Sequence, residues 1–148
     1  MKKIIGILII ASLALSFAYS EEAKWLTDFD SAKAESKTSQ KKILLKFSGS
    51  DWCGNCIRLD RTLFESDIFK EYASENLVLL SADFPSRKKN QLSKEQTEHN
   101  EMLAEKYNKD GVFPKILVLN EEGEVLGTMS LASKIAEEYL ADIKNLAK

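Results

Sequence analysis

Cysteine is scarce in this chain of 148 residues: there are two, Cys53 and Cys56, and both belong to one short motif. A disulfide between them would close almost no loop, so it would remove little entropy from the unfolded chain. A framework of disulfides that staples distant segments together is therefore excluded. The better explanation for the pair is chemical reactivity.

Histidine is scarcer still, because His99 is the only one. A structural zinc site takes four ligands, and a cysteine pair with one histidine does not supply them. We therefore expect no metal site and interpret His99, in a polar helical stretch, as a surface residue. Ile57 rather than a histidine follows Cys56, which excludes covalent haem attachment. We expect no cofactor of any kind.

An excess of positive charge is also missing, since 21 Lys and Arg residues stand against 23 Asp and Glu residues, a formal net charge of −2. This balance gives no sign of a nucleic-acid partner. Internal repeats and low-complexity segments are absent. The length fits one domain with a real hydrophobic core.

The beginning of the chain has a composition of its own. Two lysines precede an uncharged, mostly apolar run over 4–18, and small residues close it. This layout is typical of a secretory signal peptide over 1–20, cleaved after Ala18 or Ser20. An uncleaved anchor is the alternative, but the run is shorter than the ~20 apolar residues of a typical membrane span. We expect the mature domain, 21–148, to be exported to the periplasm or the extracellular space without stable membrane insertion.

Hydrophobic periodicity in the mature domain alternates between helical and strand-like segments. After a short lead-in over 21–25, the predicted helices cover 28–39 (capped by Thr27 or Asp28), 53–64, 66–74, 93–107 and 131–147 (beginning at Ser130 or Leu131), and the predicted strands cover 43–47, 77–80, 115–119 and 124–129. This alternation predicts an α/β fold with right-handed crossovers and a central sheet covered by helices on both faces. The last two strands should pair antiparallel across a tight turn.

The polar segment 83–94 contains Pro85 and a basic run, Arg87-Lys88-Lys89. Such a run can be a docking patch for a partner. A solvated loop is the more ordinary interpretation of a short charge cluster.

Trp52-Cys53-Gly54-Asn55-Cys56 follows a predicted strand and opens a predicted helix. Amides at a helix N-terminus favour a negatively charged sulfur, and cysteines so placed have pKa values lowered to about 3.5–7.5. Cys53 is then suited to attack a substrate disulfide. Cys56, one turn further along the same face, is suited to resolve the mixed disulfide.

The stretch 42–56, KILLKFSGSDWCGNC, resembles the active-site segment of the thioredoxin superfamily. Gly111-Val112-Phe113-Pro114, followed by KILVLNEEGEVLG, resembles the superfamily's cis-proline loop and the hairpin after it. The likeness is strongest to small exported bacterial thioredoxin-like proteins and to single-domain relatives of the endoplasmic reticulum. It implies a thioredoxin fold for 21–148. It also implies that Phe113 and a cis Pro114 hold the substrate chain and that Trp52 packs beside the motif.

One departure from the superfamily concerns the buried carboxylate that many thioredoxins carry beneath the second cysteine. Lys46 or Phe47 occupies that position here, and no acid does. We expect the stem of Lys46 to be packed and its head to reach solvent. No general base is assigned; water or Asp51 could serve.

These observations predict a thiol–disulfide oxidoreductase that acts on protein disulfides, with a reductase or isomerase-like role. Its partners are protein thiol or disulfide clients and a redox protein that recycles the cysteine pair. The neutral residues Gly54 and Asn55 between the cysteines argue against a strong oxidant. The alternative is a client-binding folding helper whose redox pair is regulatory.

Overall fold

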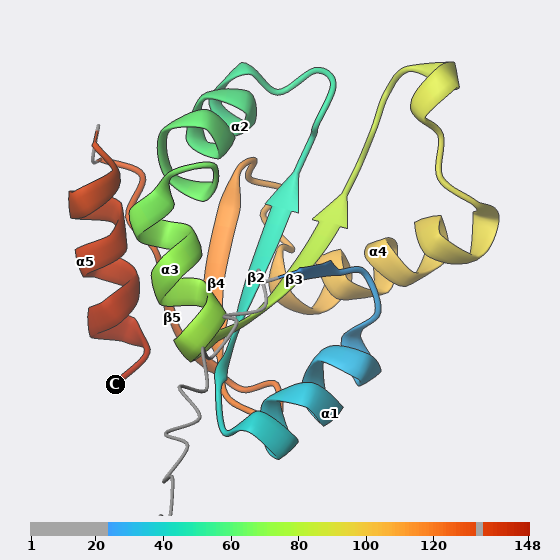
Figure 1. The fold of residues 1–148 in the computed structure, drawn as a ribbon. Helices are drawn as coiled ribbons and strands as arrows, with labels where there is room; N and C mark the ends of the chain where they lie inside the picture. Colours follow the sequence, from blue (N-terminus) through green and yellow to red (C-terminus); the bar gives the residue numbers. More distant parts are fainter. Residues whose placement is uncertain (1–23, 133–134) are drawn as a thin grey trace, which may run out of the picture.

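The computed structural model describes residues 24–132 and 135–148 (Figure 1). The predicted signal peptide and both candidate cleavage sites lie outside the described residues. Within these ranges no helix is both long enough and apolar enough to cross a bilayer.

The described chain folds as a five-stranded mixed sheet with helices on its two faces (Figure 1). The strands are β1 (Trp25–Leu26), β2 (Lys42–Ser48), β3 (Leu77–Asp83), β4 (Lys115–Leu119) and β5 (Val125–Thr128). The helices are α1 (Phe29–Ser39), α2 (Gly54–Leu59), α3 (Asp67–Asn76), α4 (Lys94–Tyr107) and α5 (Ala136–Leu146), with a π-helical turn η1 (Asp60–Phe64) and a 3-10 turn η2 (Lys88–Asn90). The sheet order is β1-β3-β2-β4-β5.

Strand directions agree with the predicted topology. β2 runs parallel to β3, and β4 runs antiparallel to β2 and to β5. The predicted antiparallel hairpin is therefore confirmed. The lead-in expected over 21–25 is partly wrong, because Trp25 and Leu26 form a short edge strand that pairs with Leu79 and Leu80 of β3.

Helix starts are set by side chains that accept backbone hydrogen bonds. Asp28, one of the two predicted caps of α1, accepts from the Ser31 amide at 2.7 Å. Ser66 caps α3 and Ser93 caps α4 in the same way. These hydrogen bonds satisfy amides that the first helical turn leaves unpaired. The bond from Ser31 also holds the pKa of Asp28 below its usual value.

The core has two layers because successive side chains of a strand point to opposite faces. On β2, Leu44 faces the layer under η1, α3 and α5, while Ile43 and Leu45 face the layer under α1 and α4. All three are fully buried. β2 and β3 thus read as nearly continuous apolar runs, as strands buried on both faces do.

Three elements differ from the prediction by more than one or two residues at a boundary. The helix predicted over 53–64 is divided, because after α2 the backbone widens to a π-helical turn in which the Glu65 amide donates to the Asp60 carbonyl at 2.9 Å. β3 continues to Asp83, since backbone pairing with β2 extends beyond the apolar run. The closing helix begins at Ala136 rather than at Ser130 or Leu131.

Candidate active site

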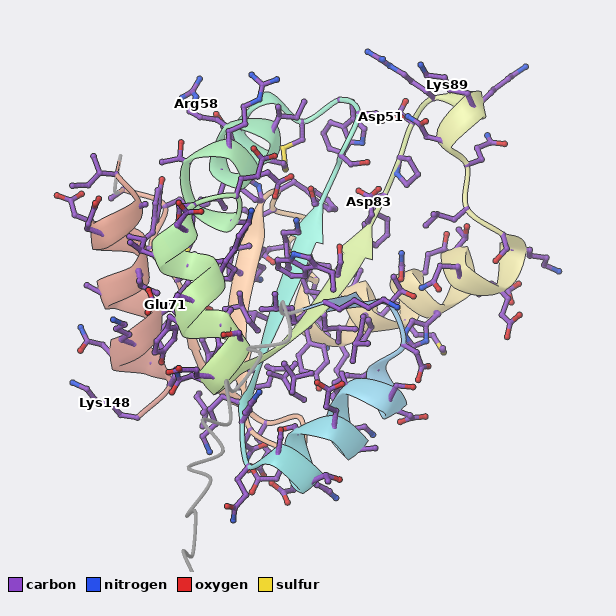
Figure 2. All side chains as sticks on the ribbon, viewed as in Figure 1. Asp51, Arg58, Glu71, Asp83, Lys89 and Lys148 are labelled. Atoms are coloured by element: carbon purple, nitrogen blue, oxygen red, sulfur yellow. A yellow bond between two sulfur atoms is a disulfide. The ribbon has the colours of Figure 1, made fainter. Side chains whose placement is uncertain are left out.

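The cysteine pair lies where β2 gives way to α2, at the upper end of the molecule in Figure 2. Cys53 is the N-cap of α2, and the amide of Cys56 donates to Cys53 Sγ at 3.2 Å. The two sulfurs are joined in a disulfide, with the Cα atoms 5.2 Å apart. The strand-to-helix context predicted for the motif is confirmed.

Both cysteines are largely covered. Cys53 is 6% exposed and Cys56 is 2% exposed. Exposure therefore does not distinguish an attacking from a resolving cysteine while the disulfide is closed. Their positions relative to α2 do distinguish the two cysteines. Cys53 precedes the first helical residue, and Cys56 lies inside the first turn.

Trp52 stands beside the pair and is 51% exposed. Its indole Nε1 donates to the Phe84 carbonyl at 2.7 Å. Its ring meets Phe113 edge-on at 5.6 Å between centroids, and Phe113 meets Phe84 in the same manner at 5.5 Å. A Cβ on Gly49 would collide with the indole, so that loop accepts no larger residue without moving Trp52. These three rings, the aromatic cluster, join the active-site loop, the end of β3 and the loop before β4.

The Phe113–Pro114 peptide bond is cis, as the resemblance implied. Phe113 and Pro114 line a groove of about 550 Å³ together with Asn55, which lies between the two cysteines in sequence. The other lining residues come from α2, η1, α5 and the segment after β5, and include Arg58, Thr62, Leu131 and Tyr139. The sequence motifs did not indicate these four residues, which lie in two helices, a π-helical turn and the segment after β5.

Lys46 does not project into solvent as expected. Its side chain is 12% exposed, and Nζ lies 2.8 Å from Asp60 Oδ1. The ammonium also lies over the rings of Trp25 (4.4 Å) and Phe64 (5.0 Å). The stem is packed as predicted, but the head is covered because Asp60, one turn beyond Cys56, supplies the opposing charge.

Asp51 is unsuited to the role of general base that the sequence left open. One carboxylate oxygen accepts from the Ser86 amide at 2.8 Å, and the other accepts from the Arg87 amide and Asn90 Nδ2. The bond from Ser86, with those from Asn90 and Arg87, holds the pKa of Asp51 below its usual value. Its function is instead to fasten the 84–90 segment to the active-site loop.

His99 is half-buried rather than simply exposed, and its Nε2 accepts from the Phe29 amide at 3.2 Å. That contact satisfies an amide in the first turn of α1. Among the residues that the structure describes, no group of three or more His, Cys, Asp or Glu side chains is arranged to hold a metal ion.

Comparisons of the sequence with protein families and with known proteins both find thioredoxin-like or disulfide-reducing relatives. A family model described as thioredoxin-like matches residues 24–121. The "Disulfide bond reductase DsbH" of Chlamydia pneumoniae is 33% identical over 117 residues, which are 79% of this chain and 69% of that protein.

Solved structures extend the likeness to three dimensions. A structure described as "DsbH Oxidoreductase" matches with a TM-score of 0.77 at 30% identity, covering 86% of this chain and 85% of that one. A thioredoxin from Thermus thermophilus matches with a TM-score of 0.63 at 14% identity, covering 85% and 88% of the two chains. At that identity the second likeness concerns the fold alone.

Proposed function

Because this chain belongs to the thioredoxin-like family, we propose that it reduces disulfides of exported client proteins through Cys53 and Cys56. It has the predicted thioredoxin fold and is a thiol–disulfide oxidoreductase. The observation that carries the proposal is the hydrogen bond of 3.2 Å from the Cys56 amide to Cys53 Sγ at the start of α2. In the reduced protein the same donor would stabilise a Cys53 thiolate.

The reaction proceeds in two exchanges. The Cys53 thiolate attacks one sulfur of the client disulfide, so a bond forms between Cys53 and the client while the client disulfide breaks. The displaced client sulfur leaves as a thiolate and takes up a proton from water. Cys56 then loses its proton and attacks Cys53 Sγ, which closes the Cys53–Cys56 disulfide and releases the second client sulfur. Two electrons pass to the client, and a reducing dithiol partner must return two electrons to the pair.

Client binding is assigned to Trp52, Phe113 and Pro114. Phe113 and Pro114 form one wall of the groove beside Asn55, and Trp52 is the most exposed member of the aromatic cluster. A half-exposed aromatic side chain offers apolar area at a small cost in conformational entropy, which suits transient contact with varied clients.

Reduction is favoured over oxidation by two observations. A relative with 33% identity is described as a disulfide bond reductase. In addition, the residues between the cysteines, Gly54 and Asn55, carry no cation that would strongly stabilise the thiolate. Export, with removal of residues 1–20, is supported by the basic start and apolar run of that segment.

The test uses serine variants of the reduced protein with a disulfide-bonded client. We expect Cys56→Ser to accumulate a mixed disulfide through Cys53, visible as a reducible adduct by mass spectrometry, and Cys53→Ser to accumulate far less. Equal trapping by the two variants would contradict the assignment of roles. A cysteine-free double variant that retains the full biological effect would favour the client-binding alternative.

A further inference from the structure

We propose that the segment 86–91, here called the basic loop, is a docking surface for acidic polypeptide segments next to the client disulfide. This inference rests on the proposed function, because it names the class of client that the same site prefers. Arg87, Lys88 and Lys89 supply the charge of the basic loop, and all three are exposed.

The basic loop is fastened to the active site rather than loosely connected to it. Asp51, two residues before Cys53, accepts hydrogen bonds from the amides of Ser86 and Arg87 at 2.8 and 3.0 Å. Asn90 Nδ2 donates to the same carboxylate at 2.8 Å. The Trp52 indole adds a fourth link, to the Phe84 carbonyl at 2.7 Å. A purely solvated connection would need no such attachment, so the three cations have a defined place relative to Cys53.

The side chains of the basic loop form no close ion pairs. Within the described part of the chain, no carboxylate lies within 4.0 Å of the charged side-chain nitrogens of Arg87, Lys88 or Lys89, whereas Lys46 and Lys115 are paired with aspartates. Asp51 directs its oxygens to amide donors of the loop, and the charge of Arg87 contributes to the lowered pKa of Asp51, so Lys88 and Lys89 are the cations that no described carboxylate offsets. The positive charge is therefore available to an external anion.

A further cation, Arg58, lines the groove that Phe113 and Pro114 also line. Arg58 is the one charged residue in the wall of the groove beside Pro114, and it too has no carboxylate within 4.0 Å in the described chain. Figure 2 labels Arg58 and Lys89 at the same end of the molecule. The sequence as a whole has a formal net charge of −2, so the positive charge at this end of the molecule is a local feature and does not reflect the net charge of the chain.

The arrangement fits a polypeptide better than a membrane surface. Cations flank a groove and an exposed indole, which together suit an extended segment carrying a disulfide and acidic neighbours. An anionic bilayer would engage the charges but leave the groove unused. Charge complementarity of this kind raises association rates and makes them depend on salt.

The test compares three synthetic peptides that share one disulfide loop and carry flanking Asp, Ser or Lys residues. We expect the reduced wild-type protein to react fastest with the acidic peptide at low salt. Lys88→Gln/Lys89→Gln should lower that rate constant by about 3- to 10-fold, leaving the Ser peptide unchanged. The matched control, Lys37→Gln/Lys148→Gln, makes the same charge change on α1 and at the C-terminus and should leave all three rates unchanged.

A second variant tests the placement of the loop. Asp51→Ala removes a negative charge, so a dependence on net charge alone would increase the preference for the acidic peptide. Loss of the three hydrogen bonds to the loop should instead decrease it. An increased preference would overturn the role of a fixed loop.

Other outcomes separate this inference from the proposed function. Equal wild-type rates with the acidic and Ser peptides would overturn the docking surface alone, whereas failure to reduce the Ser peptide would overturn the proposed function. If phosphatidylglycerol vesicles bound the wild type but not Lys88→Gln/Lys89→Gln, and the peptide rates were equal, the basic loop would be a membrane-binding surface and the inference would be wrong.

Discussion

Removing either partner of the Lys46–Asp60 ion pair should have unequal effects on stability. Lys46 is the more buried partner, with 12% of its side chain exposed against 29% for Asp60. Asp60→Asn leaves an ammonium that is mostly covered and has lost its countercharge. Lys46→Met keeps the packed stem against Trp25 and Phe64 and leaves a carboxylate that water can reach.

The expected costs lie between those of surface and buried pairs. Breaking a fully buried pair costs about 3–5 kcal/mol, and exposed pairs contribute about 0–1 kcal/mol. For this pair we expect Asp60→Asn to lower the free energy of unfolding by about 2 kcal/mol, with the two aromatic rings still stabilising the cation. Lys46→Met should lower it by about 1 kcal/mol, and the double variant by about the same, well below the sum of the single changes.

Urea unfolding of the four proteins, all in the disulfide form, measures these differences directly. A matched control is Glu98→Gln in the Lys94–Glu98 pair, whose side chains are 91% and 61% exposed and whose nearest charged atoms are 3.6 Å apart. That change should stay within about 0.5 kcal/mol. The reasoning is refuted if Lys46→Met costs more than Asp60→Asn, or if the double variant shows the full sum.

Three further predictions concern the active-site end. Gly49→Ala should displace Trp52 and slow reduction of a protein client more than exchange with dithiothreitol. The control is Gly54→Ala, where a Cβ would meet nothing within 4 Å. An unchanged tryptophan emission spectrum in Gly49→Ala would contradict the collision between the new Cβ and the indole. Asp51 has a lowered pKa in the folded protein, so its contribution to stability is present above the ordinary Asp value of about 3.9 and is lost as the pH falls through the lowered pKa. Asp51→Asn should therefore flatten the acid limb of stability measured by urea unfolding between roughly pH 2 and 4, and an identical acid limb would refute the role of its carboxylate. The reduction potential of the Cys53–Cys56 pair, measured by equilibration with glutathione buffers, should lie between about −180 and −270 mV, and a value close to −120 mV would show that the protein is an oxidant.

The sequence by itself identified the reactive pair and most of the scaffold that presents it. Cys53 and Cys56 were recognisable because four residues of local sequence, at the start of a helix that follows a strand, define the motif. Asp28 was recognisable as one of two candidate caps of α1 for the same reason, since a cap acts on amides two or three residues away. The alternation of helical and strand-like segments likewise indicated a central sheet covered by helices on both faces.

Tertiary structure alone decided how charged and polar side chains are paired. Lys46 finds Asp60, 14 residues away, and Asp51 binds amides 35 and 36 residues away. His99 accepts from an amide 70 residues away, and Trp25 and Leu26 form a strand only because β3 offers them an edge. Periodicity and capping describe interactions within one or two turns of chain. A pairing across the sheet depends on which elements become neighbours after the core has closed, and no local pattern encodes the partner of a single carboxylate, imidazole or ammonium group.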